Sequence, residues 1–485
     1  MPPFDPCGLS PEAHNGRQLD NKQATMKASR YNLSTMSPDS SRTILFNTLY
    51  GTTALIEPEE LAAVERMLTV PNAVPCSPHE LELRDILRQG RYLIGDDVDE
   101  IAAVRNRKSV GMADPNRFDL IIMPNLDCNF ACPYCYESHD HSNRMTDDVE
   151  RSIKKWIANV IPKFTVMMLS WFGGEPTLSP ERIASIGGAV LSLAKEHDVK
   201  LISHITTNGY ALTEKWIKEY TRIGVFSYQI TVDGPENAHN KTRVLASGKG
   251  SFRKVRQNII LLAKHDQRIK ISLRVNYNQH NIHHIPELLR SFPAEIRSQL
   301  RVVYEPVFGS EALSATKNMC HSQISSTIRN HYAVAESLGY DVTLGSIGVG
   351  KLVYCYAERE NQYIVNFNGD VFKCSVTDFD PAKRVGRIDA DGSFVAEQGW
   401  HDWFGMTPFD KQCEACSFLP LCMGGCRKER AARGATGSYC NLVPSNTSQS
   451  LKSIAFGHFD DHLKDKLGFG RSYNNQREVI IASSV

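Results

Sequence analysis

Three closely spaced cysteines are the residues of this sequence best suited to chemistry. They lie in the stretch Cys128-Asn-Phe-Ala-Cys132-Pro-Tyr-Cys135, a C-x3-C-x2-C spacing. Thiolates at such spacings bind zinc or iron–sulfur clusters. Three thiolates are one short of a closed tetrahedral site, and on a cubane with four irons they leave one iron open to a small molecule. The triplet therefore predicts a metal centre that a ligand from outside the chain completes.

A Gly-Gly-Glu-Pro turn follows the next predicted strand. Gly173 and Gly174 let the backbone approach a ligand closely, and the carboxylate of Glu175 can accept hydrogen bonds from an ammonium group. Two further strands end in polar residues, Thr206–Gly209 (Thr-Thr-Asn-Gly) and Thr231–Pro235 (Thr-Val-Asp-Gly-Pro). Their side chains can bind ribose hydroxyls or polar substrate groups, although each turn could also be an ordinary strand-to-helix connection.

A second set of seven cysteines lies in the last third of the chain. Its order is Cys355-x13-Gly369-x4-Cys374, then Cys413-x2-Cys416-x5-Cys422-x3-Cys426, and finally Cys440. Ten of the thirteen cysteines thus fall in two sets, and Cys7, Cys76 and Cys320 stand apart. Residues 1–30 lack the apolar segment of a secretory signal, so we expect a cytoplasmic protein whose cysteines stay reduced and bind metal.

Alternating strands and helices are predicted to position these residues. Six apolar segments are predicted to be strands: Asp119–Pro124, Val166–Phe172, Lys200–Thr206, Val225–Val232, Lys270–Tyr277 and Leu300–Pro306. The segments between them have helical periodicity. Six repeats predict a buried parallel sheet and are too few for the closed eight-stranded barrel. The expected fold class is α/β, a partial (β/α)6 TIM-like barrel with its site at the carboxyl ends of the strands.

The flanking regions differ in composition from the barrel. Residues 1–28 are polar and rich in proline, which predicts a disordered leader. Residues 29–112 combine short strands with helices, as in a winged-helix-like α+β module. The barrel is expected over residues 113–330, a cysteine-rich domain over residues 331–445, and a polar tail over residues 446–485.

The overall composition excludes some partners. A chain of 485 residues is too long for one ordinary core, so two or three domains are expected. The formal charge of +1 gives no electrostatic footprint for nucleic acid or for an anionic membrane. No apolar run approaches the ~20 residues that span a bilayer. We therefore expect neither nucleic acid nor membrane as a partner.

The triplet followed by the Gly-Gly-Glu-Pro turn resembles the motifs of the radical S-adenosylmethionine (SAM) enzymes. In that family SAM chelates the open iron of a [4Fe–4S] cluster, and its reductive cleavage yields a 5'-deoxyadenosyl radical that takes hydrogen from unreactive carbon. The resemblance implies that Cys128, Cys132 and Cys135 hold this cluster, and that an electron donor such as flavodoxin or ferredoxin reduces it. It also implies SAM contacts from Tyr134, Gly173, Gly174, Glu175, Thr231, Arg243 and Asn276.

Each implied SAM contact has its own chemical reason. The aromatic ring of Tyr134 would lie near the adenine, and the Gly-Gly-Glu turn would bind the amino group. Arg243 follows Thr231 by twelve residues, the interval found in the anaerobic sulfatase-maturating branch of the family, and its guanidinium suits the SAM carboxylate. Asn276 could reach the ribose. Any of these residues could instead serve only the packing of its turn.

The second cysteine set resembles the SPASM domain, which carries two auxiliary clusters in enzymes that modify peptides and proteins. The family's connectivity implies one cluster on Cys413, Cys416, Cys422 and Cys440, and another on Cys355, Cys374 and Cys426. Three [4Fe–4S] clusters are then expected. The sulfatase-maturating relatives carry an eighth cysteine where this chain has Asn361, so the second of these clusters has three cysteine ligands here. They also place a catalytic aspartate where this chain has Ser375, although Asp378 lies close in sequence.

These patterns predict an enzyme that oxidatively modifies a ribosomally made peptide or protein, with crosslinking the favoured outcome and no catalytic residue assigned. The module over residues 29–112 resembles leader-peptide recognition domains, but it could equally be a structural cap. One alternative is oxidation of serine or cysteine to formylglycine, as in the sulfatase-maturating relatives. A zinc-bearing scaffold is the alternative from another class, and it leaves the Gly-Gly-Glu-Pro turn without a reason.

Overall fold

The structure is a computed structural model that describes residues 25–36, 41–135, 137, 143–307, 321–342 and 350–432. Most of the expected leader, the whole of the expected tail, and Cys440 lie outside these residues. Within them, no helix combines the length and the apolar character needed to cross a membrane. Cys76 is disulfide-bonded, which corrects the expectation that every cysteine is reduced; this exposed residue lies outside both cysteine sets.

A ten-stranded sheet forms the centre of the molecule, in the order β11-β10-β9-β8-β7-β6-β12-β13-β14-β15. Six of its strands are parallel and adjacent in chain order, which confirms the predicted partial barrel. They are β6 (Arg117–Ile122), β7 (Val166–Trp171), β8 (Lys200–Thr207), β9 (Val225–Thr231), β10 (Lys270–Tyr277) and β11 (Leu300–Pro306). The sequence therefore placed every barrel strand to within two residues of its observed bounds.

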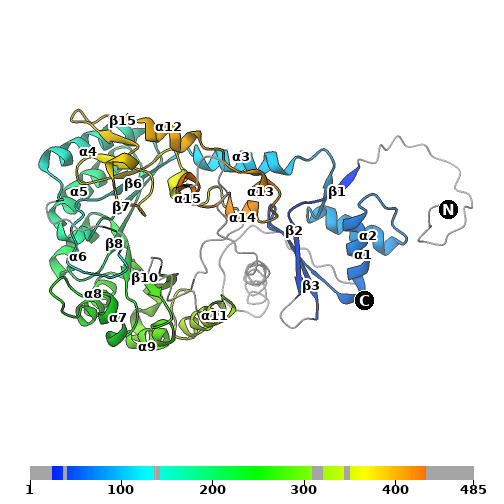
Figure 1. Cartoon of the computed structure of the whole chain (residues 1–485), viewed down its shortest axis with the longest axis horizontal. Coiled ribbons are helices and arrows are strands. Elements are labelled where there is room, and N and C mark those ends of the chain that lie inside the picture. Colours follow the sequence, from blue (N-terminus) through cyan, green and yellow to red (C-terminus); the bar gives the residue numbers. More distant parts are fainter. Residues whose placement is uncertain are drawn as a thin grey trace, which may run out of the picture.

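Helices cover the outer side of this curved sheet (Figure 1). They are α4 (Asp147–Val160), α5 (Pro180–Glu196), α6 (Glu214–Arg222), α7 (Glu236–Thr242), α8 (Phe252–His265), α9 (Ile285–Ser291) and α11 (His321–Ser337). In β10 the apolar residues Ile271, Leu273 and Val275 are buried in the core that these helices share. The alternate residues Arg274 and Asn276 are only half-buried and face the inside of the barrel.

The N-terminal region forms two small sheets and three helices; most of it lies on the right-hand side of Figure 1, and its third helix extends across the middle. β2 (Asn32–Met36), β3 (Thr43–Asn47) and β4 (Thr53–Ile56) form an antiparallel sheet, and β1 (Met26–Ala28) pairs with β5 (Leu93–Gly95). The helices are α1 (Pro58–Thr69), α2 (Pro78–Gln89) and α3 (Glu100–Met112). Whether this module recognises a peptide or acts as a cap stays a prediction.

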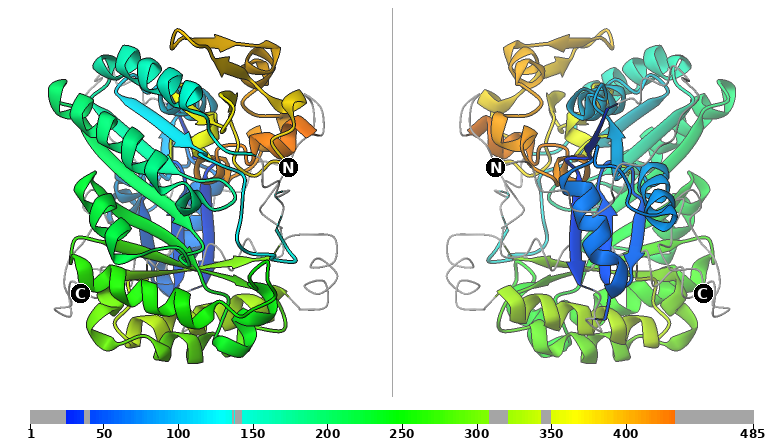
Figure 2. Two further views of the ribbon diagram at one scale, coloured as in Figure 1. Left: turned by 90° about the vertical axis from the view of Figure 1, so that its left-hand side faces the viewer. Right: turned by 90° about the vertical axis from the view of Figure 1, so that its right-hand side faces the viewer.

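The C-terminal region extends the barrel sheet, which the sequence analysis did not anticipate. β12 (Gln362–Val365) pairs in parallel with β6, and the antiparallel strands β13 (Asp370–Phe372), β14 (Gly386–Ile388) and β15 (Phe394–Ala396) follow. The helices of this region are α12 (Gln398–Gly405), α13 (Lys411–Glu414), α14 (Leu419–Cys422) and α15 (Arg427–Ala432). Figure 2 shows this region, in gold and orange, at one edge of the barrel.

The N-terminal module packs against the loops that carry the C-terminal cysteines. Tyr31 and Val104 share an apolar cluster with Leu419 and Met423. At the centre of this contact the ammonium of Lys108, on α3, is 1% exposed and donates hydrogen bonds to Glu358 at 2.5 Å and to the carbonyl of Met423 at 2.6 Å. Burial lowers the pKa of Lys108, and the charge of Glu358 opposes this effect. The ion pair therefore fixes α3 to the cysteine-bearing loops.

We expect Lys108→Ala to destabilise the protein strongly. The substitution leaves the carboxylate of Glu358, whose side chain is 0% exposed, without its cation, and breaking a buried pair in this way costs about 3–5 kcal/mol of unfolding free energy. Arg105→Ala is the matched control on the same helix, because it removes an exposed ion pair with Glu414 worth about 1 kcal/mol or less. Chemical denaturation measures both. Equal losses would contradict a special contribution from the buried pair.

Candidate functional site

The cysteine triplet lies in the loop after β6, at the carboxyl end of the parallel strands. Cys128 and Cys132 pack against the barrel core, whereas Cys135 is exposed. Burial raises the pKa of the Cys128 thiol to about 12 and also raises the pKa of the Cys132 thiol. Iron would favour the thiolate forms that burial disfavours, so binding of metal releases protons. Three thiols in one loop are the donor set that a [4Fe–4S] cluster with an open iron requires.

Side-chain positions in the structure do not by themselves outline a metal centre. Among the described residues, no three His, Cys, Asp or Glu side chains converge on a common metal position. The assignment of iron to the triplet therefore depends on the donor chemistry and on the loops around it.

The Gly-Gly-Glu-Pro turn after β7 packs directly on the cysteine loop. The backbone N–H of Glu175 donates to the carbonyl of Asp127 at 2.6 Å. A Cβ on Gly174 would lie 2.3 Å from the same carbonyl oxygen, and Gly173 has a φ of +124°, which favours glycine. The two glycines thus allow close contact between this turn and the segment just before Cys128.

The side chain of Glu175 is fully buried and holds this turn to the end of β8. Its Oε1 accepts hydrogen bonds from the Thr207 hydroxyl at 2.7 Å, from the Thr177 N–H at 3.0 Å and from the Thr177 hydroxyl. Its Oε2 accepts from the Asn208 N–H at 2.6 Å. Burial raises the pKa of Glu175, and these four donors oppose that effect. The carboxylate predicted to bind an ammonium group already has partners within the protein.

Tyr134 brings two of the other predicted site residues together. Its hydroxyl donates to Asp233 Oδ2 at 2.5 Å, and it accepts from Arg243 Nη1 at 3.1 Å and from Asn276 Nδ2 at 3.3 Å. These four residues come from the cysteine loop, the end of β9, the segment after α7, and β10. Thr231 ends β9 opposite Arg274 of β10, two residues before Asp233. We call Tyr134, Asp233, Arg243 and Asn276 the tyrosine cluster.

The tyrosine cluster contains buried polar atoms without a partner. Asp233 is 1% exposed and Arg243 is 8% exposed. Asp233 Oδ1 and Arg243 Nε are buried and make no well-formed hydrogen bond among the described residues; the backbone N–H of Asn276 lies near enough to the Asp233 carboxylate to oppose the rise in its pKa that burial causes. Burial would lower the pKa of Arg243, but the neighbouring Tyr134, Cys132 and Asp233 groups raise it, so the guanidinium stays charged. A buried acceptor beside a buried cation suits a polar, partly anionic ligand.

A second layer of hydrogen bonds holds Arg243 and Asp233 from behind. Ser251 Oγ donates to the carbonyl of Arg243 at 2.5 Å and lies 2.9 Å from His239 Nε2. The N–H of Asp233 donates to His239 Nδ1 at 3.3 Å. Burial lowers the pKa of His239, which keeps the ring neutral and Nδ1 available as an acceptor. The sequence singled out Asp233 as one of the polar residues at a strand end that could bind ribose hydroxyls or polar substrate groups, whereas no motif in it pointed to His239.

The described cysteines of the C-terminal set lie near one another. Burial raises the pKa of Cys355 to about 12, and the nearby thiols of Cys426 and Cys374 raise it further. The side chain of Asn361 points elsewhere, because its amide donates to the carbonyl of Asp114 at 3.1 Å. Cys374 and Cys426 thus lie near Cys355, and whether these three cysteines hold a cluster stays a prediction. Cys440 lies outside the described residues.

An apolar cluster connects the barrel site with the C-terminal region. Met123 and Leu126 precede the cysteine triplet and pack with Ile364 of β12 and with Phe372 of β13. Tyr356, directly after Cys355, packs on the same cluster. The two cysteine regions are therefore joined by packed side chains.

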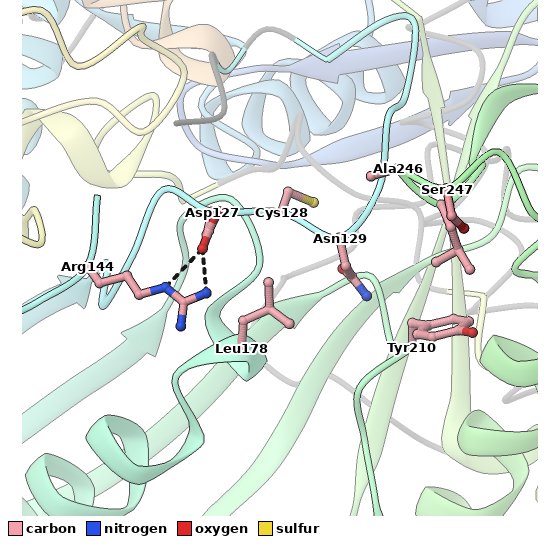
Figure 3. A pocket seen from close by; sticks show the side chains of 9 residues that line it. Asp127, Cys128, Asn129, Arg144, Leu178, Tyr210, Ala246 and Ser247 are labelled. Atoms are coloured by element: carbon pink, nitrogen blue, oxygen red, sulfur yellow. Dashed lines mark hydrogen bonds and ion pairs between the residues drawn. The ribbon is translucent and has the colours of Figure 1, made fainter. Parts of the chain in front are cut away.

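A pocket of about 420 Å³ lies beside the cysteine loop. Figure 3 shows Cys128 and Asn129 at its wall, with Leu178 and Tyr210 below them. At one side Arg144 donates two hydrogen bonds to Asp127 Oδ2, at 2.9 and 2.6 Å. No residue of the tyrosine cluster is among those that line this pocket.

Comparisons with known proteins agree with this geometry. Residues 122–292 match the Radical SAM superfamily. The serine-type anaerobic sulfatase-maturating enzyme of Bacteroides thetaiotaomicron is 27% identical over 350 residues, covering 64% of this chain and 82% of that protein. The cysteine-type enzyme of Clostridium perfringens is 24% identical over 342 residues, covering 65% of this chain and 90% of that protein.

A solved structure shares the fold. Native anSMEcpe with bound AdoMet and the Cp18Cys peptide has a TM-score of 0.53 at 20% identity, covering 73% of this chain and 99% of that one. The chain is therefore a radical SAM enzyme, a class that uses a [4Fe–4S] cluster and SAM for radical oxidation chemistry, and it is homologous to the anaerobic sulfatase-maturating enzymes.

Proposed function

We propose that this radical SAM enzyme binds SAM between the cysteine triplet and the tyrosine cluster and oxidatively modifies a ribosomally made peptide or protein. The observation that carries the proposal is the pair of buried, unpartnered atoms, Asp233 Oδ1 and Arg243 Nε, beside the cysteine loop. Buried polar atoms without partners are costly, so a ligand that supplies both partners is favoured there.

The residues of the tyrosine cluster and of the Gly-Gly-Glu-Pro turn suit different groups of SAM. The guanidinium of Arg243 would hold the carboxylate, and Asn276 would contact the ribose from the inner face of β10. The backbone carbonyls of Gly173 and Gly174 accept no hydrogen bond from the described residues, so they would receive the ammonium in place of the occupied carboxylate of Glu175. When bound, the [4Fe–4S] cluster and SAM would supply a 5'-deoxyadenosyl radical that removes a hydrogen atom from the substrate.

Oxidation requires that the substrate then give up a further electron. We propose that the C-terminal cysteines hold two auxiliary [4Fe–4S] clusters as acceptors, which makes three clusters with the triplet. Cys355, Cys374 and Cys426 would hold one, and Cys413, Cys416, Cys422 and Cys440 the other. Flavodoxin or ferredoxin is the proposed donor of the initial electron. Met123 and Leu126 pack on Ile364 of β12, and this apolar contact between the two cysteine regions supports the proposal.

A peptide or protein is the proposed substrate. The two relatives are named as enzymes that mature sulfatases, and the solved neighbour contains a peptide. The module over residues 29–112 is the proposed reader of that peptide, and a structural cap remains its alternative role. Crosslinking is the favoured modification, because it is an oxidation that needs no base at the position of Ser375.

The side chains around Ser375 offer no strong base, which disfavours formylglycine formation. That reaction stays the alternative function. The hydroxyls of Ser375 and Tyr356 lie 2.6 Å apart and are each other's partner. Asp378, the nearest substitute for the missing aspartate, accepts two hydrogen bonds from Lys383 at 2.7 and 2.8 Å. Lys383 holds the pKa of Asp378 at about 2, so this exposed carboxylate is a weak base.

We expect the change of Cys128, Cys132 and Cys135 together to alanine to abolish SAM cleavage, because no thiolate remains to hold the catalytic cluster. Formation of 5'-deoxyadenosine with dithionite as reductant is the measurement. Metal analysis should give about twelve irons per wild-type chain and about eight in the variant. Cys374→Ala is the control, and it should keep SAM cleavage that is not coupled to product.

Two results would count against this assignment. Undiminished 5'-deoxyadenosine from the triple variant would remove the triplet from the mechanism. A few zinc ions per wild-type chain, with no iron after anaerobic reconstitution, would favour the zinc-bearing scaffold instead.

We expect Asp378→Asn to change product formation less than about twofold, because a carboxylate held as an anion by Lys383 contributes little as a base. The measurement is modified peptide per 5'-deoxyadenosine formed, with a substrate peptide that a search of the neighbouring genes for short precursors would first have to supply. Lys383→Met is the companion variant, since it frees the carboxylate. A loss of about 100-fold or more in Asp378→Asn, with SAM cleavage intact, would instead support formylglycine-type chemistry.

A further inference from the structure

The side-chain amide of Asn208 points at a sulfur of the cysteine triplet. Asn208 is 5% exposed and lies in the Thr-Thr-Asn-Gly turn after β8, which the proposed function leaves without a role. Its Nδ2 lies 3.9 Å from Cys128 Sγ and donates to Asn129 Oδ1 at 2.7 Å. Its Oδ1 accepts the N–H of Tyr210 at 2.9 Å. Because a backbone donor fixes the oxygen, the nitrogen must be the atom that faces the sulfur.

The turn that carries Asn208 is held on two sides. On one side its N–H and the Thr207 hydroxyl donate to the buried carboxylate of Glu175. On the other side Asn258, from α8, donates to the carbonyls of Gly209 at 2.8 Å and Tyr210 at 2.9 Å. A turn fixed in this way keeps the amide in one orientation.

We propose that Asn208 raises the reduction potential of the catalytic cluster by donating an N–H to the sulfur of Cys128, an inference that rests on the proposed function. The reduced cluster carries one more negative charge than the oxidised cluster. A donor aimed at a ligand sulfur stabilises that extra charge, as hydrogen bonds to cluster sulfurs generally do. Asn208 is thus a positioning residue that acts through Cys128 and does not touch the substrate.

Among the described residues, two donors face this sulfur, and only one of them can be removed by substitution. The backbone N–H of Phe130 lies 3.4 Å from Cys128 Sγ and is present in any variant. Asn208 is the side-chain donor. Substitution at Asn208 therefore changes the electrostatics at the sulfur while one backbone donor stays in place.

The test is a redox titration of the reconstituted full-length enzyme, followed by electron paramagnetic resonance. The signal that changes on adding SAM identifies the catalytic cluster among the three expected. Asn208→Ala should lower its potential, because the donor is lost. Asn208→Asp should lower it further, because an isosteric carboxylate opposes the added electron while it can still accept the Tyr210 N–H.

Asn258→Ala is the matched control. It removes a buried asparagine, 1% exposed, whose amide holds the same turn through two backbone carbonyls and contacts no sulfur among the described residues, so it should lower thermal stability and leave the potential unchanged. Equal shifts in Asn208→Ala and Asn258→Ala would overturn the proposal in favour of a general effect of the turn. Wild-type potential in Asn208→Ala would overturn it directly. If the Asn208→Asp variant does not bind the iron–sulfur cluster, the comparison of Asn208→Ala with Asn258→Ala still tests the proposal.

Failure of the proposed function gives a different result. Without a SAM-dependent cluster signal in the wild-type enzyme, SAM does not bind at the triplet, and the proposed function is wrong. With that signal present and the potential unaffected by Asn208, the proposed function stands and only the role of Asn208 is wrong.

Discussion

The hydrogen bond between Tyr134 and Asp233, with Arg243 on the same phenol, is the interaction on which the site depends. It joins the cysteine loop after β6 to the ends of β9 and β10, which are neighbouring strands on the far side of the half-barrel. Asp233 and Arg243 are buried charges, and buried charges are stable only when they are paired and hydrogen-bonded. Tyr134 links them, and the atoms left without partners are those that a ligand such as SAM can satisfy.

Other buried carboxylates connect parts of the structure in a similar way. Glu175 holds the turn after β7 to the end of β8, and the glycines before it let that turn contact the cysteine loop. Farther away, the buried pair of Lys108 and Glu358 fixes the N-terminal module to the loops of the C-terminal cysteines. Each of these buried contacts joins segments that are far apart in the sequence. A ligand bound at the cysteine loop would therefore contact residues whose positions are fixed by several strands and helices.

The sequence was informative where a pattern is local. Apolar segments rich in valine, isoleucine and leucine located the barrel strands, and spacing alone identified the cysteine sets. The resemblance to the radical SAM family, and not a local pattern, singled out Tyr134, Arg243 and Asn276; the structure brings them together on one hydroxyl, and their contact with SAM stays a prediction. Long-range contacts were not visible in this way. The pairing of the short strand β12 with β6, the saturated carboxylate of Glu175 and the disulfide state of Cys76 depend on segments that lie far apart in the chain or outside any motif.

The central claim is that SAM binds to the iron left open by the three cysteines, with its carboxylate on Arg243. Electron–nuclear double resonance on the reduced enzyme with SAM labelled with nitrogen-15 at its amino group tests it most directly. We expect a hyperfine coupling between that nitrogen and the iron–sulfur cluster in the wild-type enzyme, and a weakened or altered coupling in Arg243→Gln. Bound SAM without any such coupling in the wild-type enzyme would contradict the account.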